Sequence, residues 1–159
     1  MYIEYFGLQE EPFDLAPDPK FIYLSEVHKE ALARLQFGIE MRKGLLVLTG
    51  EVGTGKTTLI QTLLKNRKSF QKIAFLIHPG VIENRLIQSV CREFGIDLDF
   101  QQLSKADILN ILYEYILKKS YNDHNFVVII DDAHDLTDEQ LKDVLLLCKL
   151  ETNTRQLLQ

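Results

Sequence analysis

The sequence predicts an α/β fold in which helices cover both faces of a parallel sheet. Three short apolar runs, at residues 45–49, 73–77 and 126–130, have the length and composition of buried strands. Helical patterns lie between these runs, and a glycine-rich turn separates the first run from the helix after it. This alternation favours parallel pairing, because a parallel strand must be reached through a crossover connection. With 159 residues, the chain is long enough to form one domain with its own core.

The composition excludes several other classes of protein. The longest apolar runs are far shorter than the roughly 20 residues of a membrane-spanning helix. The N-terminus lacks the basic start and apolar centre of a secretory signal, so we expect a cytoplasmic protein. Cys91 and Cys148 have no CxxC partners, which argues against a zinc site or a disulfide framework. The net charge of −5 argues against general attraction to nucleic acid.

Capping residues and apolar periodicity predict the helices. Ser25 is a typical N-cap for a helix that continues to about residue 41. Ser104 with Asp107, and Thr137 with Gln140, have the spacing of capping boxes. The expected helices cover residues 25–41, 56–65, 84–94, 105–119 and 137–150, and the last should present an apolar face of Leu141, Val144, Leu145 and Cys148.

The first 24 residues differ from the rest of the chain. Pro12, Pro17 and Pro19 interrupt a segment that is rich in tyrosine and phenylalanine. Proline fixes φ and removes a backbone donor, so this segment is expected to be an extended arm. Its aromatic rings should hold it against the core. The sequence therefore predicts two regions, an arm at residues 1–24 and a folded domain at residues 25–159.

A phosphate-binding motif follows the first predicted strand. Residues 50–58 read GEVGTGKTT and match GxxxxGK[ST] in the strand-loop-helix context that this motif requires. The glycines let backbone N–H groups approach phosphate oxygens at a helix N-terminus, where the helix dipole favours negative charge. Lys56 should reach the β- and γ-phosphates and assist catalysis, and the Thr57 hydroxyl should bind Mg²⁺. The expected nucleotide-binding residues are Gly50, Glu51, Val52, Gly53, Thr54, Gly55, Lys56, Thr57 and Thr58.

Two carboxylates end the third apolar run, in the manner of a Walker B motif. Asp131 and Asp132 follow residues 126–130, at the edge of a parallel sheet where ligands bind. Successive side chains point in opposite directions along a strand, so the two acids can have different roles. We expect Asp131 to hold Mg²⁺ through water and Asp132 to orient the attacking water as a catalytic residue. Aspartate is one methylene shorter than the glutamate usual at this position, which predicts slow hydrolysis.

Short signature segments along nearly the whole chain indicate which family of P-loop proteins the sequence resembles. They are YFGL at residues 5–8, EPF at 11–13, PDP at 17–19, FIYL at 21–24, His28 with EAL at 30–32, LTGEVGTGKTT at 48–58, IIDDAHDL at 129–136 and LET at 150–152. With these segments the chain resembles the AAA+ ATPases of the general secretion pathway protein A (ExeA-like) type. The resemblance implies a P-loop NTPase fold of the AAA+/ASCE type, a three-layer sandwich around a parallel sheet.

The resemblance also carries structural expectations. It implies that the arm lies near the adenine, with residues 21–28 touching the base. It implies a further strand between the two Walker strands, and the sequence stops at residues 155–159, about where that strand should begin. We therefore expect a partial AAA+ domain, truncated after the Walker B helix, with an incomplete sheet. Such a chain should either self-associate or use its last residues as a makeshift strand.

The function implied is that of an ATPase with ATP and Mg²⁺ as cofactors, weak or inactive in a chain of this length. The resemblance further implies a homo-oligomer that supports assembly of a secretion or pilus apparatus, working with partner proteins at the cytoplasmic face of the inner membrane. A nucleotide-gated binding module with slow hydrolysis is one alternative. A DNA-associated regulator of the transposition type is another, although the only dense basic group is Lys65, Arg67, Lys68 and Lys72.

Overall fold

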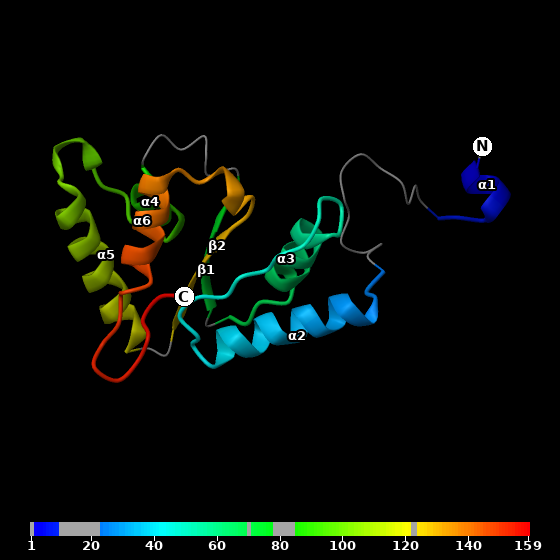
Figure 1. The fold of residues 1–159 in the computed structure, drawn as a ribbon, viewed down its shortest axis with the longest axis horizontal. Helices are drawn as coiled ribbons and strands as arrows, with labels where there is room; N and C mark the ends of the chain where they lie inside the picture. The colour runs from blue at the N-terminus through cyan, green and yellow to red at the C-terminus, as the bar shows by residue number, and fades with distance from the viewer. Residues whose placement is uncertain (1, 10–22, 70, 78–84, 122–123) are drawn as a thin grey trace.

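The computed structural model describes residues 2–9, 23–69, 71–77, 85–121 and 124–159, and Figure 1 shows their arrangement. The helices are α1 (Tyr2–Phe6), α2 (Glu26–Glu40), α3 (Lys56–Lys65), α4 (Leu86–Glu93), α5 (Lys105–Ser120) and α6 (Asp138–Leu147). The strands are β1 (Gln71–Leu76) and β2 (Asn125–Ile130), and the short 3₁₀ turns are η3 (Phe100–Gln102) and η4 (Ala133–Asp135).

A parallel pair of strands lies at the centre of the molecule. β1 and β2 pair in register from Gln71 opposite Asn125 to Leu76 opposite Ile130. The ladder continues one residue further, because the Asp131 N–H donates to the Leu76 carbonyl at 3.0 Å. The chain between the strands contains α4 and α5, which supplies the crossover that parallel pairing requires. The pairing therefore delivers Asp131 to the carboxyl end of the sheet.

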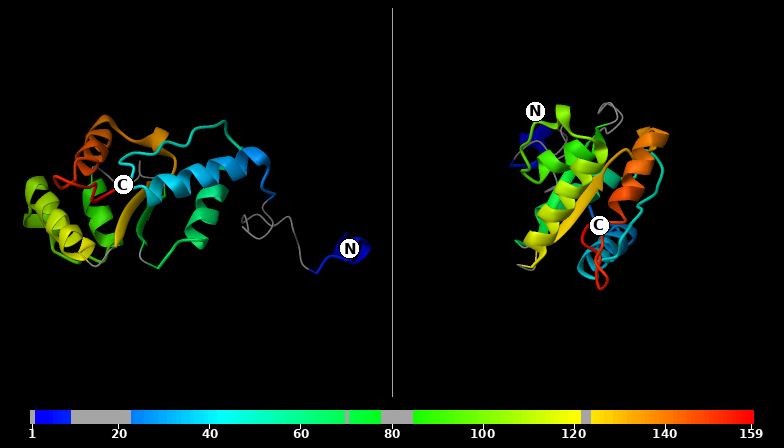
Figure 2. Two further views of the ribbon diagram at one scale, coloured as in Figure 1. Left: turned by 90° about the horizontal axis from the view of Figure 1, so that it is seen from below. Right: turned by 90° about the vertical axis from the view of Figure 1, so that its left-hand side faces the viewer.

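Helices cover both faces of this sheet, as the sequence predicts. Phe126 joins a core formed with α4, α5 and the end of α6, whereas its neighbour Val127 joins a second core with α2 and α3. This division follows from the alternation of side chains along a strand. Figures 1 and 2 show β1 and β2 between α4, α5 and α6 on one side and α2 and α3 on the other. The result is a three-layer α/β arrangement.

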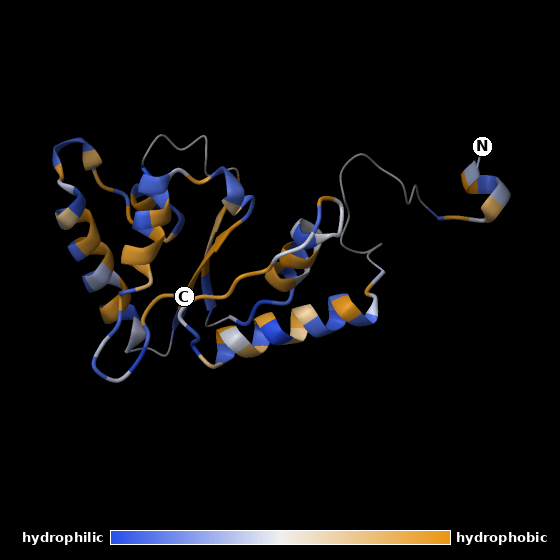
Figure 3. Cartoon of the chain, in the orientation of Figure 1, coloured by the Kyte–Doolittle hydropathy of each residue, from blue (hydrophilic) through white to orange (hydrophobic). Residues whose placement is uncertain are grey.

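The prediction of a strand at residues 45–49 is wrong. In the described part of the chain this segment pairs with neither strand, and Leu45 and Val47 are exposed. Figure 3 colours it as a hydrophobic stretch between α2 and α3. A strand needs a partner for its backbone groups, and here a groove of about 570 Å³ separates the segment from β2. Leu46 lies instead against Gly38 of α2, where an added Cβ would come within 2.6 Å of the leucine.

The last residues of the chain begin a third strand beside β2. Leu158 forms a parallel bridge with Phe126. The Val128 N–H donates to the Gln159 carbonyl at 2.7 Å, and the Gln159 N–H donates to the Phe126 carbonyl at 3.1 Å. Leu158 is fully buried in the larger core. This pairing agrees with the expectation that a strand begins at about residues 155–159.

The predicted helices form with small shifts of their ends. The Ser25 side chain caps α2, and both expected capping boxes are present, at Ser104 and Thr137. α6 ends at Leu147 rather than near residue 150. In the described parts of the chain, no helix combines the length and apolarity needed to cross a membrane.

The predicted apolar face of α6 is only partly packed. Leu141 and Leu145 are exposed, whereas the buried positions are Gln140, Asp143 and Leu147. The reason is that Leu141 borders the groove beside β2, while Asp143 faces α5 and forms an ion pair with Lys105. The spacing of apolar residues along α6 cannot predict that a polar residue of this helix is buried by pairing with a residue of another helix.

The N-terminal arm is described only in part. Residues 2–6 form the short helix α1 instead of an extended segment, and none of its side chains is buried. Pro12, Pro17, Pro19 and the aromatic residues near them lie outside the described residues. The division into an arm at residues 1–24 and a domain at residues 25–159 therefore stays a prediction.

Candidate nucleotide-binding site

The glycine-rich loop lies between the extended segment at residues 45–49 and α3. Gly53 and Gly55 have φ values of +80° and +83°, which only glycine adopts without strain. Gly55 is the N-cap of α3, and the helix begins directly with Lys56. At Gly50 an added Cβ would come within 3.0 Å of the Thr54 hydroxyl oxygen, so a close approach requires this glycine. The loop thus brings its backbone to the N-terminus of a ten-residue helix, as a phosphate-binding loop requires.

Lys56 folds back over the loop. Its ammonium donates to the Gly50 carbonyl at 2.9 Å and to the Glu51 carbonyl at 2.8 Å. The Thr54 hydroxyl also donates to the Glu51 carbonyl, at 2.8 Å. These bonds close the loop on itself and place the ammonium group at its centre. An anion at the helix N-terminus would therefore meet a positive charge that is already held by the loop.

The structure joins the loop to the end of β2 through Thr57 and Asp131. The Thr57 hydroxyl donates to Asp131 Oδ2 at 2.8 Å, although the two residues are 74 positions apart. Asp131 is buried, and its other oxygen, Oδ1, accepts from the Asp132 N–H at 3.1 Å. A hydroxyl and a carboxylate side by side form the oxygen-rich donor set that Mg²⁺ prefers. The two residues predicted as metal ligands therefore lie together and fit a divalent cation.

Asp132 takes a less common backbone conformation. Its φ is +51°, in the left-handed region, and it is the N-cap of η4. Aspartate tolerates this region better than most residues with a side chain. The turn directs the chain from the end of β2 into Ala133, His134 and Leu136, which border the groove together with Lys56. Asp132 thus borders the same groove as Gly50 and Lys56 of the loop. It lies at the carboxyl end of the sheet together with Asp131, where the sequence predicts both residues.

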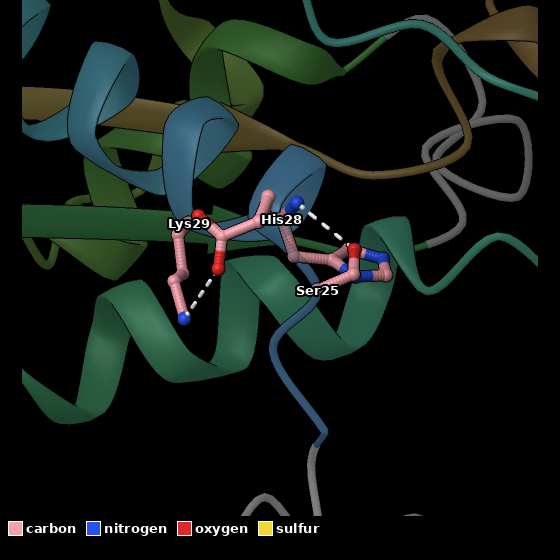
Figure 4. Close-up of polar contacts among 4 residues, drawn as sticks. Ser25, His28 and Lys29 are labelled. Carbon is pink, nitrogen blue, oxygen red and sulfur yellow. Dashed lines mark hydrogen bonds and ion pairs between the residues drawn. The ribbon is translucent and has the colours of Figure 1, made fainter.

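His28 ends the stretch at residues 21–28 that the resemblance places near the adenine, and the structure shows it in contact with the phosphate loop. Its Nε2 lies 2.9 Å from the Thr54 carbonyl oxygen, so the start of α2 is bonded to the phosphate loop. Its Nδ1 lies 2.8 Å from the Ser25 hydroxyl, and Figure 4 shows the two side chains together at the start of α2. The sequence carries one signal for this contact, since His28 belongs to the N-terminal signature of the resemblance. It gives no reason to expect a contact with the loop.

The two cysteines belong neither to the glycine-rich loop nor to the acidic end of β2, although Cys148 borders the groove. Both are free thiols; Cys91 is buried in the core beside β1 and Cys148 is half-buried. Burial raises the pKa of the Cys91 thiol to about 11 and also raises the pKa of Cys148. A thiol with such a pKa is almost entirely protonated near neutrality, so Cys91 behaves as a core side chain.

Comparisons with known proteins identify the family of this chain. The family described as "AAA domain" matches residues 39–159, which include the loop, β2 and α6. The chain belongs to this AAA family. It therefore has the P-loop NTPase fold, and its parallel strands and flanking helices form part of that α/β architecture.

A curated relative supports the narrower resemblance. The chain is 38% identical over all 159 residues to general secretion pathway protein A of Aeromonas hydrophila. It spans 29% of the length of that relative. No solved structure gives a significant match. The similarity extends to residues 1–38, which the family match does not include, so the arm and most of α2 also resemble the secretion protein.

Proposed function

We propose that this domain binds ATP together with Mg²⁺ and hydrolyses it. The observation that carries this proposal is the hydrogen bond between Thr57 and Asp131, which unites the glycine-rich loop with the acidic strand end. A glycine-rich turn or an acidic strand end alone has ordinary structural explanations. A phosphate-binding loop, a lysine and a metal-type donor pair at one end of a parallel sheet together favour a nucleoside triphosphate with its cation.

Each residue has a distinct proposed role. The backbone N–H groups of residues 50–58 bind the phosphate oxygens at the N-terminus of α3. Lys56 exchanges its bonds to the Gly50 and Glu51 carbonyls for bonds to the β- and γ-phosphates. Thr57 and Asp131 would hold Mg²⁺, the carboxylate through water, and the bound cation neutralises charge that develops on the phosphates. Asp132 orients the attacking water.

The cellular role is proposed from the relative's name. General secretion pathway protein A is 38% identical to this chain over its whole length. We therefore propose that the domain acts in a homo-oligomer that supports assembly of a secretion or pilus apparatus, with partner proteins at the cytoplasmic face of the inner membrane. Because the chain spans 29% of that relative, we propose weak or absent hydrolysis for these 159 residues alone.

One observation favours a second candidate, a nucleotide-gated binding module with slow hydrolysis. Asp132 has a side chain one methylene shorter than glutamate, which limits how far its carboxylate reaches toward a water molecule. A DNA-bound regulator has weaker support, because Lys68 of the basic group forms an ion pair with Glu40. Duplex binding that disappears on charge reversal at Lys65 and Lys72 would favour that role.

Phosphate release from Mg·ATP tests the proposal. In the full-length protein we expect activity that Lys56→Ala and Asp131→Asn each reduce at least a hundredfold. Lys29→Ala is the matched control, because Lys29 is an exposed lysine that pairs with Glu26 on the outer side of α2. Nucleotide binding without measurable release, in the presence of partner proteins, would support the gated module instead. Equal rates in the wild type and in Lys56→Ala would contradict the proposal.

A further inference from the structure

The strongest contact that the proposed chemistry leaves unexplained is the one between His28 and the phosphate loop. His28 lies in the first turn of α2 and Thr54 lies 26 residues later, in the loop. The contact joins a side-chain ring to a backbone carbonyl, at 2.9 Å. It does not involve Lys56, Thr57 or Asp131, and it engages Thr54 through the backbone carbonyl, which is an acceptor and not one of the N–H groups proposed to bind phosphate.

The partners of the ring fix which nitrogen carries the proton. A carbonyl oxygen can only accept, so Nε2 must be the donor to Thr54. In the neutral ring Nδ1 then has a lone pair and accepts from the Ser25 hydroxyl at 2.8 Å. The Ser25 oxygen in turn accepts from the His28 backbone N–H at 3.3 Å, as the N-cap of α2. Both ring nitrogens are thus satisfied, and the ring is held from the helix side.

The bond to Thr54 also fixes a peptide plane. In a trans peptide the carbonyl and the N–H of the next residue point in opposite directions. The Thr54 carbonyl faces His28, so the Gly55 N–H faces away from it. Gly55 forms one side of this peptide and has a φ of +83°, and glycine has little conformational preference of its own. The start of α3 holds the Gly55 carbonyl, which accepts from the Leu59 N–H, and the His28 contact restrains the Thr54 carbonyl from outside the loop.

We propose that His28 is a positioning residue that holds the Thr54–Gly55 peptide with the Gly55 N–H facing the bound phosphates. This inference rests on the proposed nucleotide binding. The His28 contact also links the start of α2, which directly follows the N-terminal arm, to the conformation of the phosphate loop. Near Gly55 the contact is close, since an added Cβ would lie 3.4 Å from His28 Nε2.

Three variants at position 28 test the proposal by the affinity for a fluorescent ATP analogue. His28→Ala removes the donor, and loss of one hydrogen bond predicts binding about three- to tenfold weaker. His28→Gln places an amide N–H where Nε2 lies and should restore affinity to within about twofold. His28→Asn is too short to reach Thr54 and should bind as weakly as His28→Ala. Lys29→Ala, on the adjacent position, should bind like the wild type (Figure 4).

The amide hydrogen exchange of Gly55 in the nucleotide-bound protein gives a second readout. Faster exchange in His28→Asn than in His28→Gln supports the proposal even if His28→Ala does not fold. Wild-type affinity in His28→Ala or His28→Asn, together with lost affinity in Lys56→Ala, would overturn the inference and leave the proposed function intact. Affinity lost equally in the glutamine and asparagine variants would also overturn it. Absence of saturable ATP binding by the wild type would refute both.

Discussion

Replacing Thr57 by valine isolates the hydroxyl that joins the phosphate loop to the acidic strand end. Valine has nearly the shape of threonine, so the substitution removes one hydrogen bond and one candidate metal ligand without opening a cavity. The Thr57 hydroxyl donates to Asp131 Oδ2 at 2.8 Å. In Thr57→Val the Asp131 carboxylate would still accept the hydrogen bond from the Asp132 N–H, at 3.1 Å in the structure.

The structure sets the size of the expected loss. A hydrogen bond to a charged group contributes about 1.5–3 kcal/mol to stability. Because Thr57 is exposed while Asp131 is buried, the lower end applies, and we expect Thr57→Val to lower the free energy of unfolding by about 1.5 kcal/mol. With a urea dependence of about 2 kcal/mol per molar, the unfolding midpoint should fall by about 0.7 M.

The same variant should lose its response to Mg²⁺. Wild-type ATP affinity is expected to be higher in Mg²⁺ than in EDTA, whereas Thr57→Val should have nearly equal affinities in both. Thr57→Ser keeps the hydroxyl and should retain both the stability and the Mg²⁺ response. Calorimetric titration and urea unfolding measure the two effects. If Thr57→Val matched the wild type in both, the pairing of Thr57 with Asp131 would be structurally and chemically unimportant.

Three further predictions concern Asp132, Cys91 and Leu158. Asp132→Glu should raise the rate of phosphate release despite about 1 kcal/mol of strain at positive φ, and an unchanged or lower rate would mean that another group positions the water. With a pKa near 11, Cys91 should have about one thiolate per thousand molecules at pH 8 and react with iodoacetamide more slowly than Cys148; equal labelling by mass spectrometry would contradict this. Leu158→Ala should cost about 2–5 kcal/mol in urea unfolding, as much as Leu112→Ala in α5, and a negligible loss would show that the last residues do not pack on β2.

Local signals in the sequence predict the helices and the two paired strands well. Ser104 and Thr137 each start a capping box, because a cap depends on residues only three positions apart. The loop motif is equally local, and it correctly predicts the turn and the start of α3 at Lys56. The meeting of Thr57 with Asp131 was predictable because a phosphate-loop threonine and a Walker B aspartate are expected to serve the same Mg²⁺.

Features that depend on distant partners were not predictable in this way. The apolar run at residues 45–49 has the composition of a strand, but strand formation also requires a neighbour at hydrogen-bonding distance. The buried side of α6 was misassigned because Asp143 is compensated by Lys105 on another helix. The contact of His28 with the phosphate loop was unpredictable for the same reason, since its partner is a backbone carbonyl 26 residues away, and every residue has such a group.

Direct titration of the protein with ATP tests the central claim, which is that the loop and Asp131 together bind a metal-nucleotide complex. Isothermal calorimetry should give saturable binding in the presence of Mg²⁺, weaker binding in EDTA, and none with Lys56→Ala. Saturable binding that is indifferent to Mg²⁺ and to Lys56, or no binding by the wild type, would contradict the account.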